Sequence, residues 1–328
     1  MLKSKLQEYL QIAEPQINKF LDEYKPQVES LYIPIDYALE GGKKIRLASV
    51  VLGSDVFNGD LKEASKAASA LEIFHNFTLL HDDVMDKSVV RRNRPTVQSK
   101  WNPNQAILSG DAMVVLVYNK LLSLSEGKLP KVMKLLNQTA LEVCEGQQLD
   151  MDFETRPDIQ LDEYLKMIRL KTAVLLAASL AIGAIIADAS DENIENIYNF
   201  GINLGLAFQI QDDYFDTFGD FETFGKRIGN DIVTNKKTYL IIKALELAND
   251  EQKSTLLKLY VTNNFNEQSK IQQVTEIFKS LKIDELALRQ VEQYYSESLK
   301  FLEKLSNIAE DKKQLLYQYA EYLLKRKK

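Results

Sequence analysis

The sequence predicts an all-α protein, and three observations support this fold class. All seven prolines lie within the first 157 residues, so the rest of the chain lacks the strongest helix breaker, which costs about 3 kcal/mol inside a helix. Apolar residues recur at spacings of three and four, as in Leu161, Tyr164 and Ile168, and alternating strand patterns are absent. Capping boxes, which begin helices, occur at Asp60–Glu63 and Asn249–Gln252.

The expected elements follow from these signals in chain order. The capping box at Asp60 begins a helix, and so does the box at Asn249. Two asparagines and two prolines predict a loop over residues 87–103, and three glycines predict another over 219–234. The expected helices cover residues 3–22, 35–57, 61–86, 104–124, 130–154, 159–187, 191–218, 235–248, 250–263, 267–281, 285–306 and 310–325.

The helix expected over residues 159–187 is apolar nearly all round beyond Thr172 and is rich in alanine. A helix without a polar face is buried among other helices, and small residues let its neighbours approach closely. The sequence therefore predicts central helices inside a ring of others. Length alone suggests about two domains of ~150 residues. However, the chain has no linker, low-complexity tract or repeat, so we expect one domain over residues 1–328.

Composition excludes several classes of function. The net charge of −6 argues against a nucleic-acid-binding surface, which needs clustered positive charge. A single cysteine, Cys144, rules out an internal disulfide, and two histidines make a zinc site of Cys and His ligands a poor expectation. The N-terminal residues do not resemble a secretory signal. The apolar stretch over 173–187 is shorter than the ~20 residues that span a bilayer. We therefore expect a soluble, cytoplasmic protein without a transmembrane segment.

Two segments of the form Asp-Asp-x-x-Asp carry the strongest chemical signal, at Asp82–Asp86 and Asp212–Asp216. Each follows an apolar helical run, and residues four apart share a helix face. Three carboxylates repel one another near a helix end, where the dipole is already negative. Mg²⁺ would offset this charge, because it prefers oxygen ligands and is usually held by one or two carboxylates plus substrate phosphates.

Three other interpretations of the acidic segments are less favoured. A single copy could be a solvated acidic helix end, but two copies after apolar runs make this improbable. Neither copy has the twelve-residue loop of an EF-hand. The segment from Gly219 to Lys226 is one residue too long for a P-loop and has no Ser or Thr after the lysine.

Cations accompany the acidic motifs, as a site for metal and phosphate requires. Lys43 and Arg46 follow a glycine pair, and Arg91 follows the first motif by five residues. Lys171 opens the apolar helix, where a bare lysine has no evident structural role. Each of these cations alone is more often a surface residue, so the combination is what indicates a site.

In this combination the sequence closely resembles the trans-isoprenyl diphosphate synthases of the polyprenyl synthetase family. The matching segments, in the family's order, are GGKKIR (41–46), HNFTLLHDDVMD (75–86), RR (91–92), LSGD (108–111), EGQQLDM (145–151), KT (171–172), FQIQDDYFD (208–216), GKRIGNDI (225–232) and NKKT (235–238). The resemblance implies an all-α homodimer of isoprenoid synthase type, with a helical bundle around a deep cavity. It also implies about three Mg²⁺ ions that bridge the acidic motifs to an allylic diphosphate, with isopentenyl diphosphate bound alongside.

The resemblance also assigns roles residue by residue. The implied metal ligands are Asp82, Asp86 and Asp212. Further ligands, or hydrogen-bond acceptors beside the metal, are Asp83, Asp213 and Asp216. These six aspartates and Lys171 are the expected catalytic residues. Residues that match the allylic diphosphate contacts are Arg91, Lys171, Thr172, Gln209, Lys226 and Lys236. Residues that match the isopentenyl diphosphate pocket are Lys43, Arg46, His75 and Arg92.

Some residues keep two interpretations. His75 shares the face of Asp82, which suits a phosphate contact, but it could be a core or dimer-contact histidine. His81 could act as a base, although we favour a side chain that lines the cavity or makes a local hydrogen bond. The resemblance implies that the released diphosphate accepts the proton. The basic end over residues 325–328 either closes over the site or only solubilises the chain. Leu47 stands where the family usually has proline, which would favour the first helical turn.

The side chains before Asp82 are expected to set the product length. Thr78 and Phe77 lie four and five positions earlier, about 6–7 Å deeper along the helix, and Phe74 lies below them. The small side chain of Thr78 leaves room beneath Asp82. Farnesyl-length enzymes often carry an aromatic residue at that position. The pattern predicts geranylgeranyl diphosphate as the main product, with farnesyl diphosphate as the alternative.

Two rival functions share parts of this pattern. A class I terpene cyclase has the same fold and first motif, but its second metal site normally mixes Asn, Ser or Thr, and Glu. A non-catalytic subunit of a heteromeric prenyltransferase typically loses acidic ligands, whereas this chain keeps all six aspartates.

Overall fold

The computed structural model describes residues 2–24, 28–219, 228–261 and 266–324. The chain forms two compact units, each made of separate stretches. The first unit comprises Met1–Thr139, Leu176–Tyr198 and Lys304–Leu315, and the second comprises Ala140–Leu175, Asn199–Glu303 and Leu316–Lys328. Four of the unit boundaries fall inside helices, so these boundaries are not linkers. One domain over residues 1–328 stays a prediction.

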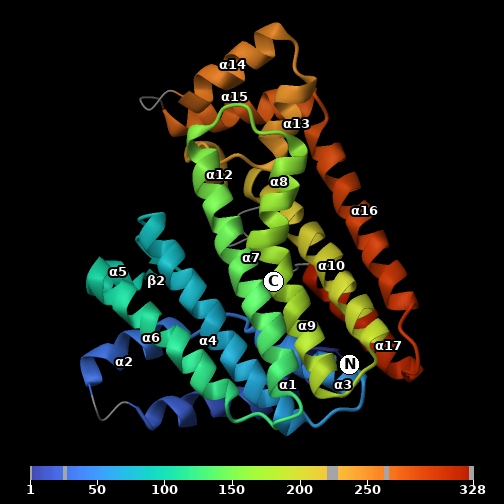
Figure 1. Cartoon of the computed structure of the whole chain (residues 1–328). Helices are drawn as coiled ribbons and strands as arrows, with labels where there is room; N and C mark the ends of the chain where they lie inside the picture. The colour runs from blue at the N-terminus through green and yellow to red at the C-terminus, as the bar shows by residue number, and fades with distance from the viewer. Residues whose placement is uncertain (1, 25–27, 220–227, 262–265, 325–328) are drawn as a thin grey trace. The chain divides into compact units, whose positions relative to one another are not determined.

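The elements are almost entirely helical, as Figure 1 shows. The first unit contains α1 (Leu2–Asp22), α2 (Glu29–Leu39), α3 (Ile45–Val56), α4 (Leu61–Met85), β1 (Val90–Arg91), β2 (Arg94–Pro95), α5 (Val97–Lys100) and α6 (Pro103–Leu121). The second contains α8 (Leu161–Ile168), the π-helix η1 (Arg169–Ala173), α12 (Asn230–Val233), α13 (Tyr239–Leu247), α14 (Asp250–Val261), α15 (Glu267–Ser280) and α16 (Ile283–Glu303). The helices with residues in both are α7 (Leu129–Thr155), α9 (Val174–Ile186), α10 (Asp191–Phe218) and α17 (Glu310–Leu324).

The all-α prediction is confirmed, with corrections at three places. The helix expected over 35–57 is two helices, α2 and α3. Gly41 and Gly42 have φ values of 75° and Lys44 has 46°, and this left-handed backbone cannot continue a right-handed helix. The expected loop over 87–103 contains the β1–β2 hairpin and α5. The described part of the expected loop over 219–234 contains α12, and the helix expected from residue 235 begins only at Tyr239.

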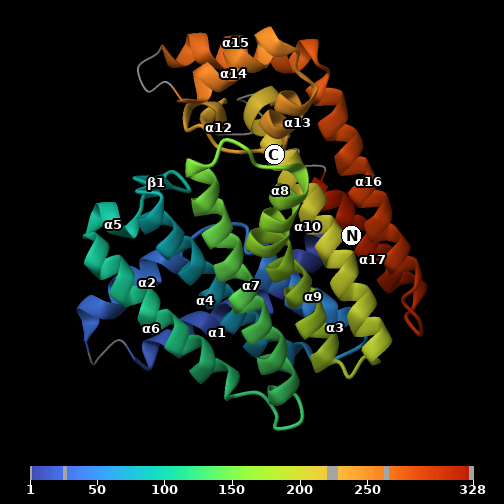
Figure 2. The same cartoon turned by 45° about the horizontal axis from the view of Figure 1, so that its top comes forward.

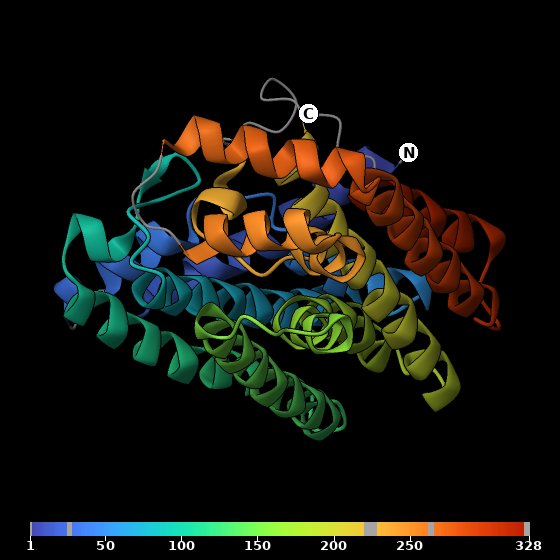
Figure 3. The ribbon, with the colours of Figure 1, turned by 90° about the horizontal axis from the view of Figure 1, so that it is seen from above.

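Helix α4 is the central helix of the first unit. It packs against α6, α3 and α1, and Figures 1 and 3 show α4 and α6 side by side. Its first half presents small buried residues, among them Ala64, Ala67 and Ala68, which let the neighbouring helices approach closely. At the edge of this core, the Tyr9 hydroxyl donates to the Asp55 carboxylate at 2.7 Å. These contacts fix the helix that ends at the first acidic motif.

The apolar helix predicted to be buried is buried. Every residue of α9 is buried, and within the first unit Gly183 packs against the backbone of Val50 and Gly53 on α3. The apolar stretch belongs to a continuous helix, Leu161–Ile186, which is long and apolar enough to cross a membrane by length and composition. However, 83% of its most apolar window is buried inside the protein, as in a core helix of a soluble protein.

The second unit contains a layer of shorter helices. Helices α14 and α15 lie side by side in Figure 2, and α15 also packs against α13 and α16. The buried side chains of Leu256, Val274 and Phe278 form the core of this layer. Helix α10 carries the second acidic motif near its C-terminal end.

Candidate functional site

The first acidic motif lies at the C-terminal end of α4. The helix ends at Met85, and Asp86 is its C-cap residue. Asp86 is exposed, whereas the side chains of Asp82 and Asp83 are only 17% and 8% exposed. The motif therefore presents carboxylates at a helix end, where the helix dipole gives them no stabilisation.

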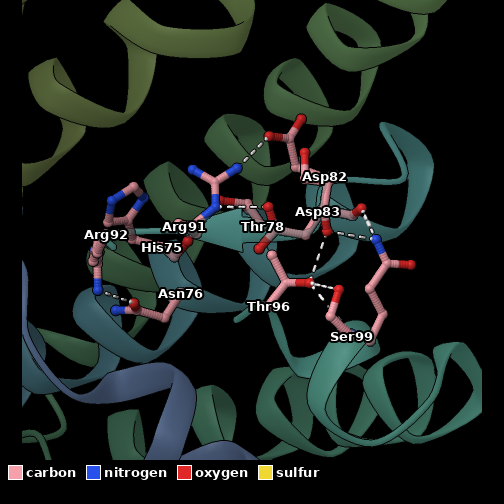
Figure 4. A network of polar contacts seen from close by, with 11 residues as sticks. His75, Asn76, Thr78, Asp82, Asp83, Arg91, Arg92, Thr96 and Ser99 are labelled. Carbon is pink, nitrogen blue, oxygen red and sulfur yellow. Dashed lines mark hydrogen bonds and ion pairs between the residues drawn. The ribbon is translucent and has the colours of Figure 1, made fainter. Parts of the chain in front are cut away.

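Arg91 offsets the negative charge of this motif. Its Nη2 lies 3.1 Å from Asp82 Oδ2, and its Nε donates to Asp83 Oδ1 at 2.8 Å, as Figure 4 shows. Burial raises the pKa of Asp83, against the lowering effect of Arg91. Ser88, which precedes the hairpin, also contacts the motif, because its backbone N donates to the Asp83 carbonyl at 2.9 Å. The structure thus confirms the proximity of Arg91 to the first motif.

A second group of cations contacts α4 about two turns before the motif, at His75 and Asn76. Arg46 Nη1 is 3.1 Å from His75 Nε2, and both residues are half-buried. Burial and the charges of Arg46, Arg92 and Arg91 hold the pKa of His75 well below its usual value, so its ring is neutral. Arg92 donates to Asn76 Oδ1 at 3.2 Å. Lys43 is exposed and precedes Arg46 at the start of α3.

The proposed chain-length residues lie on α4, between these cations and the motif. Phe74 is buried, while Phe77 and Thr78 are half-buried, and the Thr78 hydroxyl donates to the His75 carbonyl at 2.8 Å. The Phe77 ring lies 5.7 Å from that of Phe74 and 4.7 Å from that of His81. His81 Nε2 is 3.2 Å from the Ile107 carbonyl, which supports the local hydrogen bond expected for it.

The second acidic motif, within α10, is embedded differently. Asp212 is half-exposed, whereas Asp213 is 3% exposed. The Asp213 carboxylate accepts from the Tyr164 hydroxyl at 2.5 Å, from Tyr239 N at 3.1 Å and from Gln209 Nε2 at 3.2 Å. Burial, followed by the charge of Asp231, raises the pKa of Asp213 to about 7. Asp213 is therefore engaged by protein donors.

Asp216 also faces the protein. Its side chain accepts from Asp231 N at 2.9 Å, and its carbonyl accepts from Gly229 N at 2.6 Å. These two bonds hold the start of α12 beside the motif. Burial opposes the charge of Lys236, but the carboxylates of Asp231, Asp150, Asp213 and Asp212 outweigh burial and raise the pKa of Lys236.

Lys171 and Thr172 lie in the π-helix η1, which the sequence did not reveal. Lys171 Nζ lies 2.6 Å from Asp150 Oδ2, and the Thr172 hydroxyl donates to Gln209 Oε1 at 3.3 Å. A Cβ at Gly146 would lie 2.3 Å from Lys171 N, so only glycine lets α7 approach η1 this closely. Single-turn π-helices are frequent at functional sites.

Asp150 is the site residue that sequence reasoning missed. It stands inside the quoted segment EGQQLDM, yet no role was drawn for it. A half-buried lysine beside an apolar helix needs a counter-charge, and this requirement was the available signal. Lys226 and the basic end over 325–328 lie outside the described residues.

The carboxylates suit a hard cation in type, because they offer only oxygen. Among the residues that the structure describes, no three His, Cys, Asp or Glu side chains come together as a metal cluster. Within each unit, the motif carboxylates instead lie beside arginine, lysine, tyrosine or amide donors. This arrangement suits Mg²⁺ that arrives with an anionic ligand, since such Mg²⁺ takes few protein carboxylates.

Comparison with known proteins identifies the family. The family model described as polyprenyl synthetase matches residues 28–278. A geranylgeranyl diphosphate synthase of Sulfolobus acidocaldarius is 37% identical over 293 residues, which are 88% of either chain.

Solved structures agree with this match. A crystal structure of a geranylgeranyl pyrophosphate synthase is 41% identical, with a TM-score of 0.92 over 100% of this chain and 99% of that chain. A geranylgeranyl pyrophosphate synthase of Corynebacterium glutamicum, complexed with isoprenyl diphosphate and magnesium, is 25% identical, with a TM-score of 0.89 over 98% and 99% of the two chains.

Proposed function

The chain belongs to the polyprenyl synthetase family, and from this premise we propose that it is a prenyltransferase that makes geranylgeranyl diphosphate. The reaction is the condensation of isopentenyl diphosphate with an allylic diphosphate. One observation carries the proposal: in each unit, an Asp-Asp-x-x-Asp motif lies beside the cations that a diphosphate requires. These are Arg91 for the first motif and Lys236 for the second.

Asp82, Asp86 and Asp212 would hold Mg²⁺, about three ions in all, together with the allylic diphosphate. Bound Mg²⁺ would supply positive charge that stabilises the departing diphosphate. Asp82 and Asp212 are half-exposed and Asp86 is exposed, so a ligand can reach them. Asp83, Asp213 and Asp216 hold neighbouring groups in place: Arg91 for Asp83, Tyr164 for Asp213, and α12 for Asp216.

The chain's own cations and neutral polar side chains would bind and orient the two diphosphates. Those for the allylic diphosphate are Arg91, Lys171, Thr172, Gln209, Lys226 and Lys236. Those for isopentenyl diphosphate are Lys43, Arg46, His75 and Arg92. The neutral ring of His75 can donate one hydrogen bond to a phosphate oxygen without adding charge. Preorganised donors of this kind stabilise the charge that develops in the transition state.

The direct test is to incubate the purified chain with Mg²⁺, labelled isopentenyl diphosphate and, separately, each allylic primer. Chromatography of the prenyl alcohols then measures the product length. We expect a linear twenty-carbon product. A cyclic hydrocarbon would indicate a terpene cyclase, and no turnover by the chain alone would indicate a subunit that needs a partner.

Product length is proposed to depend on the α4 residues below Asp82. Thr78 is half-buried four residues before Asp82, and Phe77 is held between the rings of Phe74 and His81. Thr78→Phe should place a ring beneath the motif and shorten the main product, toward farnesyl diphosphate. An unchanged product distribution would contradict the assignment of Thr78. Phe20→Leu, a distant aromatic substitution on α1, is the control.

We also propose that the enzyme is a cytoplasmic homodimer. On α6 and its C-cap residue, exposed apolar residues lie seven, three and four positions apart, which places them on one helix face: Leu108, Val115, Tyr118 and Leu122. Exposed apolar patches of this kind mark protein interfaces. Sedimentation velocity tests the proposal. We expect the wild type to be a dimer and Val115→Asp to shift toward monomer.

A further inference from the structure

Two polar residues are buried in the middle of α4, where the surrounding side chains are apolar. Glu72 is 1% exposed and Asn76 is 2% exposed, and they lie four residues apart on one face of the helix. Leu71, Ile73 and Phe74 beside them are buried as well. Burying a carboxylate and an amide costs free energy unless their hydrogen bonds are made, so the burial of this pair requires compensating contacts.

The contacts of Asn76 fix the direction of its amide. Its Nδ2 donates to the Glu72 carbonyl at 2.8 Å and to Glu72 Oε1 at 3.0 Å. Both acceptors lie on the same residue, so the NH₂ group is held on that side. The amide oxygen consequently points away from Glu72, and it accepts from Arg92 Nη1 at 3.2 Å, as Figure 4 shows.

Arg92 is held in place from its other side as well. Its backbone has φ 54°, in the left-handed region that non-glycine residues rarely adopt. A Cβ at Gly42 would lie 2.7 Å from the Arg92 Cζ, so the guanidinium packs directly on the Gly42 backbone. Arg92 is nevertheless an exposed residue, and with Asn76 it lines a pocket of about 50 Å³. An exposed arginine beside open space would sample many rotamers if nothing held it.

Charge supports the same arrangement. Lys44, Arg92 and Arg46 all act on the Glu72 carboxylate, whose pKa is raised by burial and lowered by these three cations. The second oxygen of Glu72, Oε2, is buried and has no hydrogen-bond partner among the residues that the structure describes. Glu72 thus faces cations without a direct ion pair to any of them, and its link to Arg92 runs through Asn76.

We propose that Glu72 and Asn76 are positioning residues that hold the Arg92 guanidinium ready for the diphosphate of isopentenyl diphosphate. The inference rests on the proposed function, because it concerns how Arg92 meets one of the two substrates. Orienting the arginine before binding removes part of the entropy cost of fixing it on the ligand. The effect should therefore fall on isopentenyl diphosphate and spare the allylic primer.

The test measures KM for each substrate and kcat in the full-length enzyme with Mg²⁺. Asn76→Leu removes the acceptor for Arg92 at similar volume, and we expect KM for isopentenyl diphosphate to rise about tenfold, the loss of one charge-assisted hydrogen bond. KM for the allylic primer should change less than about twofold. Asn203→Leu on α10 is the matched control, because Asn203 also donates to the carbonyl four residues earlier, at 2.9 Å.

A double-mutant cycle shows whether Asn76 acts through Arg92. In an Arg92→Lys background, Asn76→Leu should have almost no further effect on KM. Glu72→Gln, which keeps the size but removes the charge, provides a second variant and should raise the same KM by a smaller factor. Melting temperatures of all variants show whether folding is retained.

Three outcomes would overturn the inference. These are an unchanged KM for isopentenyl diphosphate in both Asn76→Leu and Glu72→Gln, an undiminished effect in the Arg92→Lys background, or equal rises in both KM values with a lowered melting temperature. In each of these three outcomes, the wild-type enzyme still consumes isopentenyl diphosphate. Failure of the proposed function is different, since the wild type itself would then not consume isopentenyl diphosphate.

Discussion

In the first unit, the carboxylates of Asp82 and Asp83 face the guanidinium of Arg91, a half-exposed cation. In the second unit, the Asp213 carboxylate is buried and accepts from three neutral donors: the Tyr164 hydroxyl, the backbone N–H of Tyr239 and the Gln209 amide. The Asp82–Arg91 pair is partly exposed, and such a pair exchanges with solvent and ligands at small cost, whereas removing a partner from a buried hydrogen bond is expensive. One sequence pattern thus contains carboxylates available for ligands and carboxylates that belong to the protein scaffold.

The largest expected effect is on activity, and it should distinguish the aspartates available for ligands from those that accept from protein donors. Asp82→Asn should lower kcat about 10²–10³-fold, the size of effect found when a group that stabilises transition-state charge is removed. Its melting temperature should stay near that of the wild type, because Asp82 borders solvent. Removing Mg²⁺ with EDTA should abolish turnover, and added Mg²⁺ should restore it.

Steady-state kinetics and thermal unfolding check this prediction together. Asp250→Asn, at an exposed aspartate in the first turn of α14, is the control for loss of a surface charge. A variant at Asp82 with full activity, or turnover that persists in EDTA, would break the proposed division of roles.

The next effect should fall on stability. Tyr164→Phe removes the hydroxyl that donates to Asp213 at 2.5 Å and leaves the buried carboxyl short of a donor. We expect the free energy of unfolding to fall by about 1–3 kcal/mol. Urea unfolding measures it, with Tyr37→Phe as the control, since the Tyr37 hydroxyl donates to the Pro95 carbonyl at 2.8 Å in an exposed hydrogen bond. Equal losses in both variants would show that burial of the bond does not matter.

The pH dependence of stability tests the environment of Asp213 more finely. Burial raises its pKa from 3.8 to about 7, so between these values the folded protein keeps a proton that the unfolded chain has lost. This stabilising contribution is full below pH 3.8 and is lost as the pH rises through about 7. The free energy of unfolding should therefore fall more steeply from about pH 4 to 7 in the wild type than in Asp213→Asn. Parallel curves would contradict the raised pKa.

The fold class was predictable because it depends on local patterns. The capping box at Asp60 placed the start of α4, and the spacing of the aspartates predicted the two motifs. The break between α2 and α3 was missed, because Gly41 and Gly42 were interpreted as a flexible pair inside a helical region and not as its end.

Features that depend on tertiary contacts were not predictable in this way. Asp150 is identified only by its 2.6 Å contact with Lys171, and two of the donors to Asp213 come from positions 49 and 26 residues away. The sequence showed that six aspartates exist but not which of them face protein donors. Such contacts join residues far apart in the chain, and no local periodicity records them.

The smallest effect should come from the ion pair of the first motif. Lysine carries a compact charge and cannot reproduce the two contacts that Arg91 makes with Asp82 and Asp83. Because the Arg91 side chain is 33% exposed, Arg91→Lys should lower the free energy of unfolding by only about 0.2–1 kcal/mol. Urea unfolding beside Arg289→Lys, a more exposed arginine paired with Glu285, measures the difference. A loss above about 2 kcal/mol would contradict this assignment, because a loss of that size is typical of a buried ion pair and not of a partly exposed one.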